Sequence, residues 1–79
     1  MELKNEIYLL SAPWCSNCKA LKPMLYDALP ETKEINIDED PSVPAELGVM
    51  SIPTIVDNRD GKSTVITGQG ACIEFIHSN

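Results

Sequence analysis

Hydrophobic residues fall into short runs along the chain, and the spacing within each run predicts a secondary-structure element. Residues 6–11 form a dense apolar run with the length of a buried strand. From residue 21 to 28 the apolar side chains recur at i, i+3, i+4 and i+7, which predicts an amphipathic helix over about 16–29. Pro23 removes one backbone donor inside this helix and would kink it, and Pro30 ends the helix.

The second half of the chain contains three further strand patterns. Residues 34–38 alternate polar and apolar side chains, as a half-buried strand does. Residues 53–56 and 63–67 are typical of two more strands, and the turn-forming residues 57–61 lie between them. We therefore expect the last two strands to form an antiparallel hairpin.

Two helices complete the pattern. Asp40 or Ser42 can cap a short helix, and Gly48 suits the left-handed conformation that ends one. Residues 71–77 predict a closing helix. The order β-α-β-α-β-β-α predicts an α/β fold with a four-stranded mixed sheet flanked by helices, in which the first two strands are parallel.

Length, charge and hydropathy narrow the class of protein. A chain of 79 residues suffices for a single domain, which we expect to span residues 1–79. There is no apolar run of about 18 residues and no export segment, so we expect a soluble, cytoplasmic, monomeric protein without membrane contact. The net charge is −6 and the basic residues are scattered. Nucleic-acid binding, which needs a basic stripe, is therefore disfavoured.

The strongest chemical signal is Trp14-Cys15-Ser16-Asn17-Cys18, at the junction of the first strand and the first helix. Cys15 falls at the helix N-terminus, where unpaired amides and the helix dipole stabilise a thiolate. Lys19 and Lys22 add positive charge nearby. Cys18 follows one helical turn later, close enough to attack a mixed disulfide on Cys15. The pair therefore indicates thiol–disulfide exchange, with Cys15 as nucleophile and Cys18 as resolving thiol.

A metal site is the alternative use of such a pair. Zinc usually takes four ligands, and Cys72 and His77 are the remaining candidates. On one helix their i and i+5 spacing points them about 140° apart, so they do not easily share a metal. We expect no metal ligands, with Cys72 a buried small hydrophobe. The acidic run 38–40 is expected to be a solvated loop.

The arrangement of these motifs resembles the thioredoxin and glutaredoxin superfamily. The shared features of the first half are the strand–WCxxC–helix unit, here Trp14 to Cys18, and the helix proline, here Pro23. Those of the second half are the Ile-Asn-Ile-Asp strand (residues 35–38) followed by Pro41, the Ile-Pro-Thr segment (residues 52–54) and the late glycine Gly68. The resemblance covers almost the whole chain, in a short form of glutaredoxin size.

The resemblance implies roles for residues outside the cysteine pair. It implies a cis bond between Ile52 and Pro53, with the proline ring packed against the disulfide and blocking metal capture. The Ile52 backbone would then pair with an extended substrate. Trp14 and Gly68 would complete the substrate groove. The implied activity is reduction of protein disulfides, such as that of ribonucleotide reductase, by a dithiol electron carrier without a bound cofactor.

Two departures from the thioredoxin pattern affect the mechanism. Leu9 stands where the family has a buried aspartate, and Glu34 stands where it has a lysine. The usual proton acceptor for the second cysteine is then missing. Either Glu34 or water accepts the proton of Cys18 instead, or the attack of Cys18 on the mixed disulfide is slower.

The electron source stays open between a thioredoxin reductase and glutathione. Glutaredoxins, the alternative function, usually have Thr-Val-Pro and a Gly-Gly-x-Asp that binds glutathione. This chain has Ser51-Ile52-Pro53 and Gly68-Gln69-Gly70-Ala71 instead. With Trp14 before Cys15, the balance favours a thioredoxin-like reductant.

Overall fold

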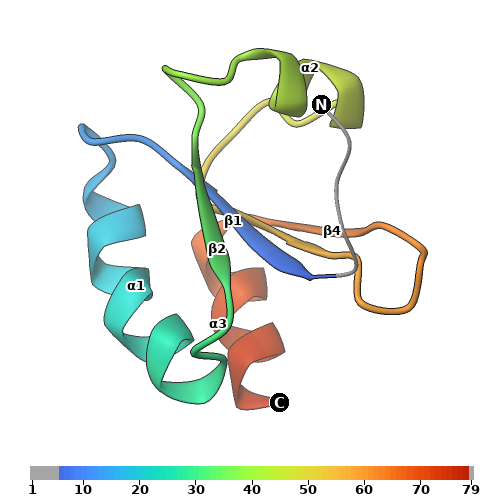
Figure 1. Ribbon diagram of the computed structural model, residues 1–79. Helices are drawn as coiled ribbons and strands as arrows, with labels where there is room; N and C mark the ends of the chain where they lie inside the picture. The colour runs from blue at the N-terminus through green and yellow to red at the C-terminus, as the bar shows by residue number, and fades with distance from the viewer. Residues whose placement is uncertain (1–5, 79) are drawn as a thin grey trace.

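The structure is a computed structural model that describes residues 6–78. Residues 1–5, Lys4 among them, and Asn79 lie outside the described residues, so the expected domain bounds stay a prediction. Seven elements follow one another in the expected order (Figure 1). They are β1 (Ile7–Ser11), α1 (Ser16–Ala28), β2 (Lys33–Asn36), α2 (Ser42–Leu47), β3 (Thr54–Asp57), β4 (Thr64–Thr67) and α3 (Gln69–His77).

The four strands form one mixed sheet in the order β2-β1-β3-β4. β1 and β2 run parallel, whereas β3 pairs antiparallel with both β1 and β4. Leu9, in the middle of β1, lies opposite Glu34 of β2 and Ile55 of β3. The predicted α/β class, the parallel first pair and the hairpin are confirmed.

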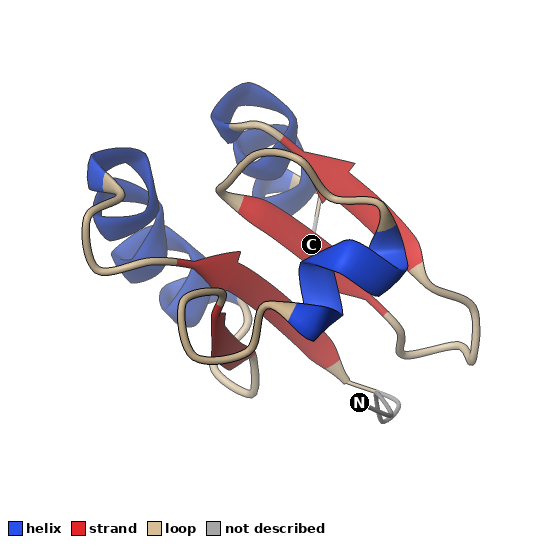
Figure 2. Ribbon diagram, turned by 90° about the horizontal axis from the view of Figure 1, so that it is seen from above, coloured by secondary structure: helices blue, strands red, loops and turns tan. Residues whose placement is uncertain are grey.

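The alternation of β1 divides the core between the two faces of the sheet. Figure 2 shows the sheet between two layers of helices, with α1 and α3 on one side and α2 on the other. Leu9 and Ile55 pack with Leu21 and Leu25 of α1 and Ile76 of α3 on one face. On the opposite face another set of side chains packs under α2, namely Tyr8, Leu10, Ile35, Val43 and Val56. Every residue of β1 is buried because it has helices on both faces.

β2 is shorter than its sequence pattern. The alternation predicted a strand over 34–38, but the strand ends at Asn36. The Asn36 side chain accepts a hydrogen bond from Asp38 N at 2.9 Å, and the backbone carbonyl of Asn36 accepts one from Asp40 N at 2.9 Å. These bonds fold the chain into a turn, so Asp38 leaves the sheet.

The ends of two helices also differ from expectation. α2 has Pro41 as its N-cap residue without a side-chain hydrogen bond, so neither Asp40 nor Ser42 caps it through a side chain. Gly48 ends this helix at φ 70°, as predicted. α3 begins at Gln69, two residues before the expected start at Ala71, because Gly68 N bonds to Pro53 and Cys72 N to Gly68.

The topology brings three chain segments to one end of the sheet. β1 ends at Ser11 beside the start of α1, Ile37 N bonds to Ser11 O at 2.9 Å, and the chain enters β3 through Pro53. The cysteine pair, the β2–α2 loop and the Ile-Pro-Thr segment therefore meet there. Within residues 6–78 no helix is long and apolar enough to cross a membrane.

Candidate active site

Cys15 and Cys18 form a disulfide at the N-terminus of α1, with Cα atoms 5.3 Å apart. Cys15 is the N-cap residue, with extended backbone angles of φ −88° and ψ 104°. Its Sγ accepts a hydrogen bond from Cys18 N at 3.2 Å. The sulfur thus takes the place of a capping oxygen, and the same amide can stabilise a thiolate once the disulfide is reduced.

The two sulfurs differ in access. Cys15 keeps 7% of its surface exposed, whereas Cys18 has none. Ala12 is buried with them, and Ile37 and Ile52 pack against this cluster. A partner can therefore reach the disulfide only from the Cys15 side.

Trp14 stands at the surface beside the pair, with 66% of its area exposed. Its indole Nε1 donates a hydrogen bond of 3.0 Å to Asp38 Oδ2 in the β2–α2 loop. Asp38 therefore holds the tryptophan next to Cys15. Nothing in the chain near Asp38 signals this pairing, since the two residues are far apart in sequence and the aspartate resembles any loop acid.

The Ile52–Pro53 bond is cis, and Pro53 is buried. Gly68 N donates to Pro53 O at 3.0 Å, which ties the start of α3 to the segment that enters β3. Gly68 has φ 96°, a conformation that side chains of L-residues rarely adopt. No hydrogen bond of the Ile52 backbone is found within residues 6–78.

A polar cluster lies between α1 and the sheet, on the face that Leu9 occupies. The Ser11 hydroxyl donates to Glu34 Oε2 at 2.5 Å, and Lys22 Nζ lies 2.5 Å from the same oxygen. Burial acts to raise the pKa of Glu34, but the hydrogen bonds from Lys22 and Ser11 and the lysine charge lower it overall. Leu9 itself is fully buried. Lys22, which was expected to add positive charge near the thiols, forms an ion pair with Glu34.

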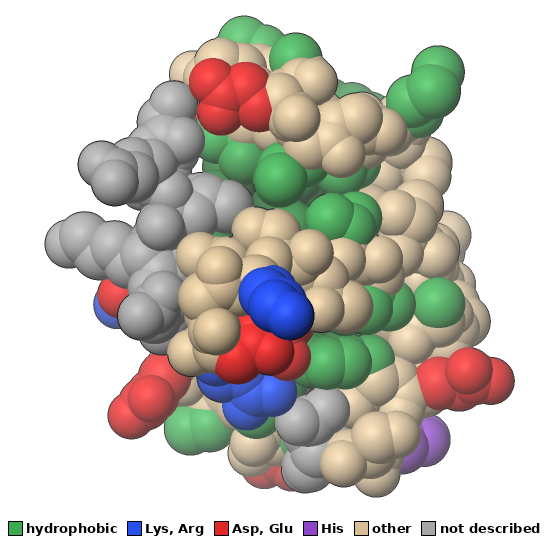
Figure 3. Space-filling view, turned by 90° about the vertical axis from the view of Figure 1, so that its right-hand side faces the viewer, with side chains coloured by type: hydrophobic (Ala, Val, Ile, Leu, Met, Phe, Trp, Pro, Cys, Tyr) green, Lys and Arg blue, Asp and Glu red, His purple; other side chains and the backbone are tan. Residues whose placement is uncertain are grey.

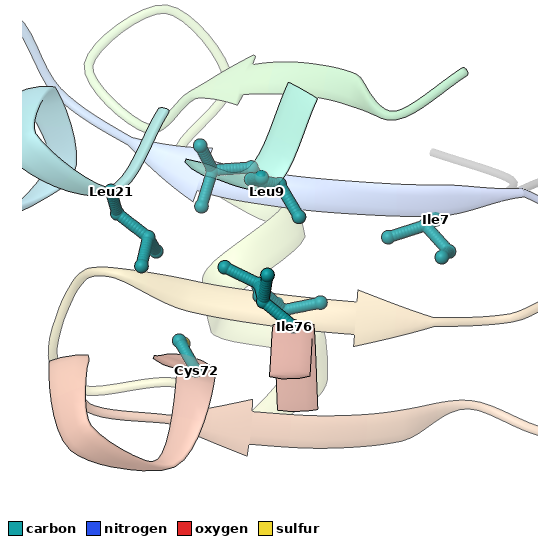
Figure 4. Close-up of a cluster of buried hydrophobic side chains, with 7 residues drawn as sticks. Ile7, Leu9, Leu21, Cys72 and Ile76 are labelled. Carbon is teal, nitrogen blue, oxygen red and sulfur yellow. The ribbon is translucent and has the colours of Figure 1, made fainter. Parts of the chain in front are cut away.

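Cys72 lies apart from the pair, fully buried on α3 (Figure 4). Its Sγ is 3.4 Å from Ile66 O and 3.8 Å from Pro53 O. Burial raises the pKa of this thiol. The prediction of a buried small hydrophobe is confirmed.

A search of residues 6–78 for three or more clustered metal-binding side chains finds none. Cys15 and Cys18 are bonded to each other, and Cys72 contacts the carbonyls of β4 and Pro53. The Cys3His set considered from sequence is therefore not assembled in the described fold.

Comparison with known proteins gives consistent results. The thioredoxin family model matches residues 3–76. Thioredoxin of Rickettsia felis is 40% identical over 57 residues, which are 65% of this chain and 54% of that protein. Thioredoxin of Rickettsia bellii is 32% identical over 86% of this chain and 74% of its own length. For several of these relatives, such as that of Rickettsia felis, the matched region is little more than half of their length.

Solved structures agree with the sequence comparison. Mitochondrial thioredoxin 3 of Saccharomyces cerevisiae superposes with a TM-score of 0.71 at 27% identity, covering 92% of this chain and 76% of the yeast protein. A mutant thioredoxin of Halobacterium salinarum gives 0.73 at 25% identity over 91% of this chain and 71% of its own. With the motif order, the fold and the family model in agreement, this chain belongs to the thioredoxin family.

Proposed function

We propose that the chain is a thiol–disulfide oxidoreductase, a dithiol electron carrier that reduces disulfides in protein clients through Cys15-Ser16-Asn17-Cys18. The observation that carries this proposal is the pair's position at the N-terminus of α1, with Cys15 the more accessible sulfur. Family membership supports the same reaction class. No bound cofactor is needed, because the two thiols themselves hold the electrons.

The reaction consists of two exchange steps. In the reduced protein the Cys15 thiolate attacks one sulfur of the client disulfide, whose S–S bond breaks, and the other client sulfur leaves as a thiolate. Cys18 then loses its proton and attacks Cys15 Sγ, which breaks the mixed disulfide and releases the second client thiolate. Both client sulfurs take up protons, and two electrons have passed from the pair to the client.

The client would lie along the segment that precedes β3. An extended chain can add to the Ile52 backbone, whose groups make no hydrogen bond within residues 6–78. Pro53 and Gly68 form the floor of this site, since Gly68 N holds Pro53 O. Trp14 forms the wall on the Cys15 side.

Removal of the Cys18 proton does not use a raised-pKa carboxyl in this proposal. Leu9 fills the place of the family's aspartate, and the hydrogen bonds of Lys22 and Ser11 outweigh burial and lower the pKa of Glu34. Such a carboxylate is a weak base. We propose that water or the departing client thiolate accepts the proton.

Insulin-disulfide reduction, followed through NADPH consumption, tests the proposal in two arms. One arm regenerates the protein with thioredoxin reductase, and the other with glutathione and glutathione reductase. Turnover in the first arm alone is the expected result, and turnover in the second alone would indicate a glutaredoxin. If both arms fail, dithiothreitol as reductant decides: insulin reduction would indicate a dedicated reductase, and none would contradict the proposed function.

A further inference from the structure

A groove of about 350 Å³ opens beside the disulfide. Its apolar lining comes from the loop before α1, the residue after β2, α2 and the loop before β3, namely Trp14, Ile37, Pro44, Val49, Met50 and Ile52. Ile37 and Ile52 also pack against the Cys15–Cys18 cluster. The groove is therefore continuous with the site of exchange.

Two of its side chains are far more exposed than core packing requires. Among the large hydrophobic residues of the described chain, Met50 is 97% exposed and Trp14 66%, compared with 39% for Val65 and 36% for Met24. Covering an exposed methionine removes its apolar surface from water, which is favourable, and its unbranched side chain adapts to irregular surfaces. The two most exposed apolar side chains thus line one groove and gain from being covered by a partner.

The segment that supplies most of the groove lining carries charges of one sign. Every charged residue from 34 to 58 is acidic, and this segment supplies the whole groove lining except Trp14. Asp38, Glu39 and Asp40 lie between the lining residues Ile37 and Pro44. Within residues 6–78 no lysine or arginine pairs with these three carboxylates.

Elsewhere in the described chain two acidic side chains have basic partners, Glu34 with Lys22 and Asp57 with Arg59. In the β3–β4 loop, Arg59 Nη2 lies 3.0 Å from Asp57 Oδ2. On the face seen in Figure 3, basic side chains lie against acidic ones near the centre, and further acidic side chains stand apart from them. The β2–α2 loop thus carries three carboxylates without a lysine or arginine partner in residues 6–78. That of Asp38 meets the groove at Trp14, and Glu39 and Asp40 line a neighbouring hollow.

We infer that this groove selects clients in which an apolar side chain and a lysine or arginine lie close to the disulfide in an extended segment. The apolar side chain covers Met50 and Trp14, and the basic one faces the acidic rim of residues 38–40 (hereafter the acidic rim). This inference rests on the proposed function and specifies its substrate class. A second copy of this chain is a poor occupant, because two acidic surfaces repel each other.

Three disulfide-linked peptides test the inference. They are identical except that the positions beside the cysteine carry leucine and lysine, leucine and glutamate, or serine and lysine. Pre-reduced protein is mixed with each peptide, and the second-order rate constant is measured at low and high salt. We expect the leucine–lysine peptide to react about tenfold faster than each of the others, and its advantage over the glutamate peptide to shrink as salt screens the rim. Equal rates, or a faster glutamate peptide, would overturn the inference.

Variants locate the effect. Met50→Ser should remove the leucine preference, and Glu39→Gln with Asp40→Asn should remove most of the lysine preference. Met24→Ser on α1 and Glu74→Gln on α3 are the matched controls, since neither side chain lines the groove, and both should behave like the wild type. A control that removes either preference as strongly as its groove counterpart would contradict the inference.

A second measurement separates failure of the groove from failure of the proposed function. Cysteine-free versions of the peptides are titrated into the Cys15→Ser/Cys18→Ser double variant and followed by NMR. We expect the leucine–lysine peptide to bind most tightly and to shift the resonances of Trp14 and Met50. Reduction of the neutral 2-hydroxyethyl disulfide with equal binding of all three peptides would overturn only the groove. Selective binding without reduction of any disulfide would overturn only the proposed function.

Discussion

The three cysteines of this fold lie in two contrasting surroundings. Cys15 and Cys18 are at the edge of the core, where an amide at the start of α1 points at the Cys15 sulfur. Cys72 is enclosed by aliphatic side chains between α3 and the sheet, and burial raises its pKa. The same functional group lies at a helix N-terminus in one position and is enclosed in the core in the other. Reactivity here depends on which backbone and side-chain groups surround the sulfur.

The largest expected effect separates the two positions by activity. Cys15→Ser should reduce disulfide exchange to the background rate, because no other accessible sulfur remains at the helix N-terminus. Cys72→Ser should exchange at the wild-type rate per folded molecule. The rates are compared by insulin reduction with dithiothreitol.

Cys18→Ser completes this comparison. It should accumulate a mixed disulfide between Cys15 and the client, which mass spectrometry detects. The assignment of the two positions would be reversed if Cys15→Ser exchanged disulfides at an appreciable fraction of the wild-type rate. Loss of exchange in Cys72→Ser would reverse it as well.

The next largest effect is on stability, where a core residue and a residue beside the cysteine pair should differ. Leu9→Ala should lower the free energy of unfolding by about 2–5 kcal/mol, because it opens a cavity among side chains that pack on Cys72. Trp14→Ala should change it by less than about 1 kcal/mol, since the indole is mostly exposed and loses one hydrogen bond. Urea unfolding measures both. In client reduction the order should reverse, so that Trp14→Ala loses more activity per folded molecule than Leu9→Ala. If the variant that loses more stability also loses more activity, the division between core and site would be contradicted.

A smaller effect concerns the alkaline side of the stability profile. The raised pKa of Cys72 means that the unfolded thiol ionises before the folded one. The stability that this thiol contributes is fully present below its ordinary pKa of 9.0 and is lost as the pH rises through the folded value. Oxidised wild-type protein should therefore lose on the order of 1 kcal/mol more than Cys72→Ala between about pH 8 and about pH 10. Parallel unfolding profiles for the two proteins would indicate a thiol that ionises freely in the fold.

The smallest effect concerns Glu34. Its pKa is lowered in the fold, so its contribution is present above the ordinary value of 4.5 and is lost as the pH falls through the folded value. Because the side chains of Glu34 and Lys22 are about one third exposed, the contribution should be below about 1 kcal/mol. Glu34→Gln should thus be less stable than the wild type at neutral pH and approach it in acid, with Glu74→Gln as control. A difference that grows towards acid pH would have the wrong sign for this ion pair.

Sequence patterns were sufficient for elements whose partners are local or repetitive. Apolar spacing predicted α1, and the turn residues 57–61 predicted the β3–β4 hairpin. Patterns failed where a side chain bonds to a neighbouring backbone instead of following its strand, as Asn36 does in ending β2. They also failed at α2, where Pro41 and not a polar side chain precedes the helix.

In the candidate site, too, some features follow from the sequence and others do not. The Cys15–Cys18 pair follows from the sequence, because four consecutive residues at a strand–helix junction specify both the sulfurs and the helix end that faces them. The hydrogen bond from Trp14 to Asp38 and the capture of Lys22 by Glu34 do not follow from it. The first joins the segments that follow the paired strands β1 and β2, and the second joins α1 to β2, so they depend on strand pairing and on the packing of α1 against the sheet.

The sequence by itself determined the order of elements and the place of the Cys15–Cys18 pair, since hydrophobic spacing and helix capping act over a few residues. The tertiary structure decided which side chains surround that pair. It buried Cys18 fully, left a small part of Cys15 exposed, and assembled an apolar groove from segments that meet at one end of the sheet. The physical reason is that such contacts depend on strand pairing and layer packing, which no local pattern encodes.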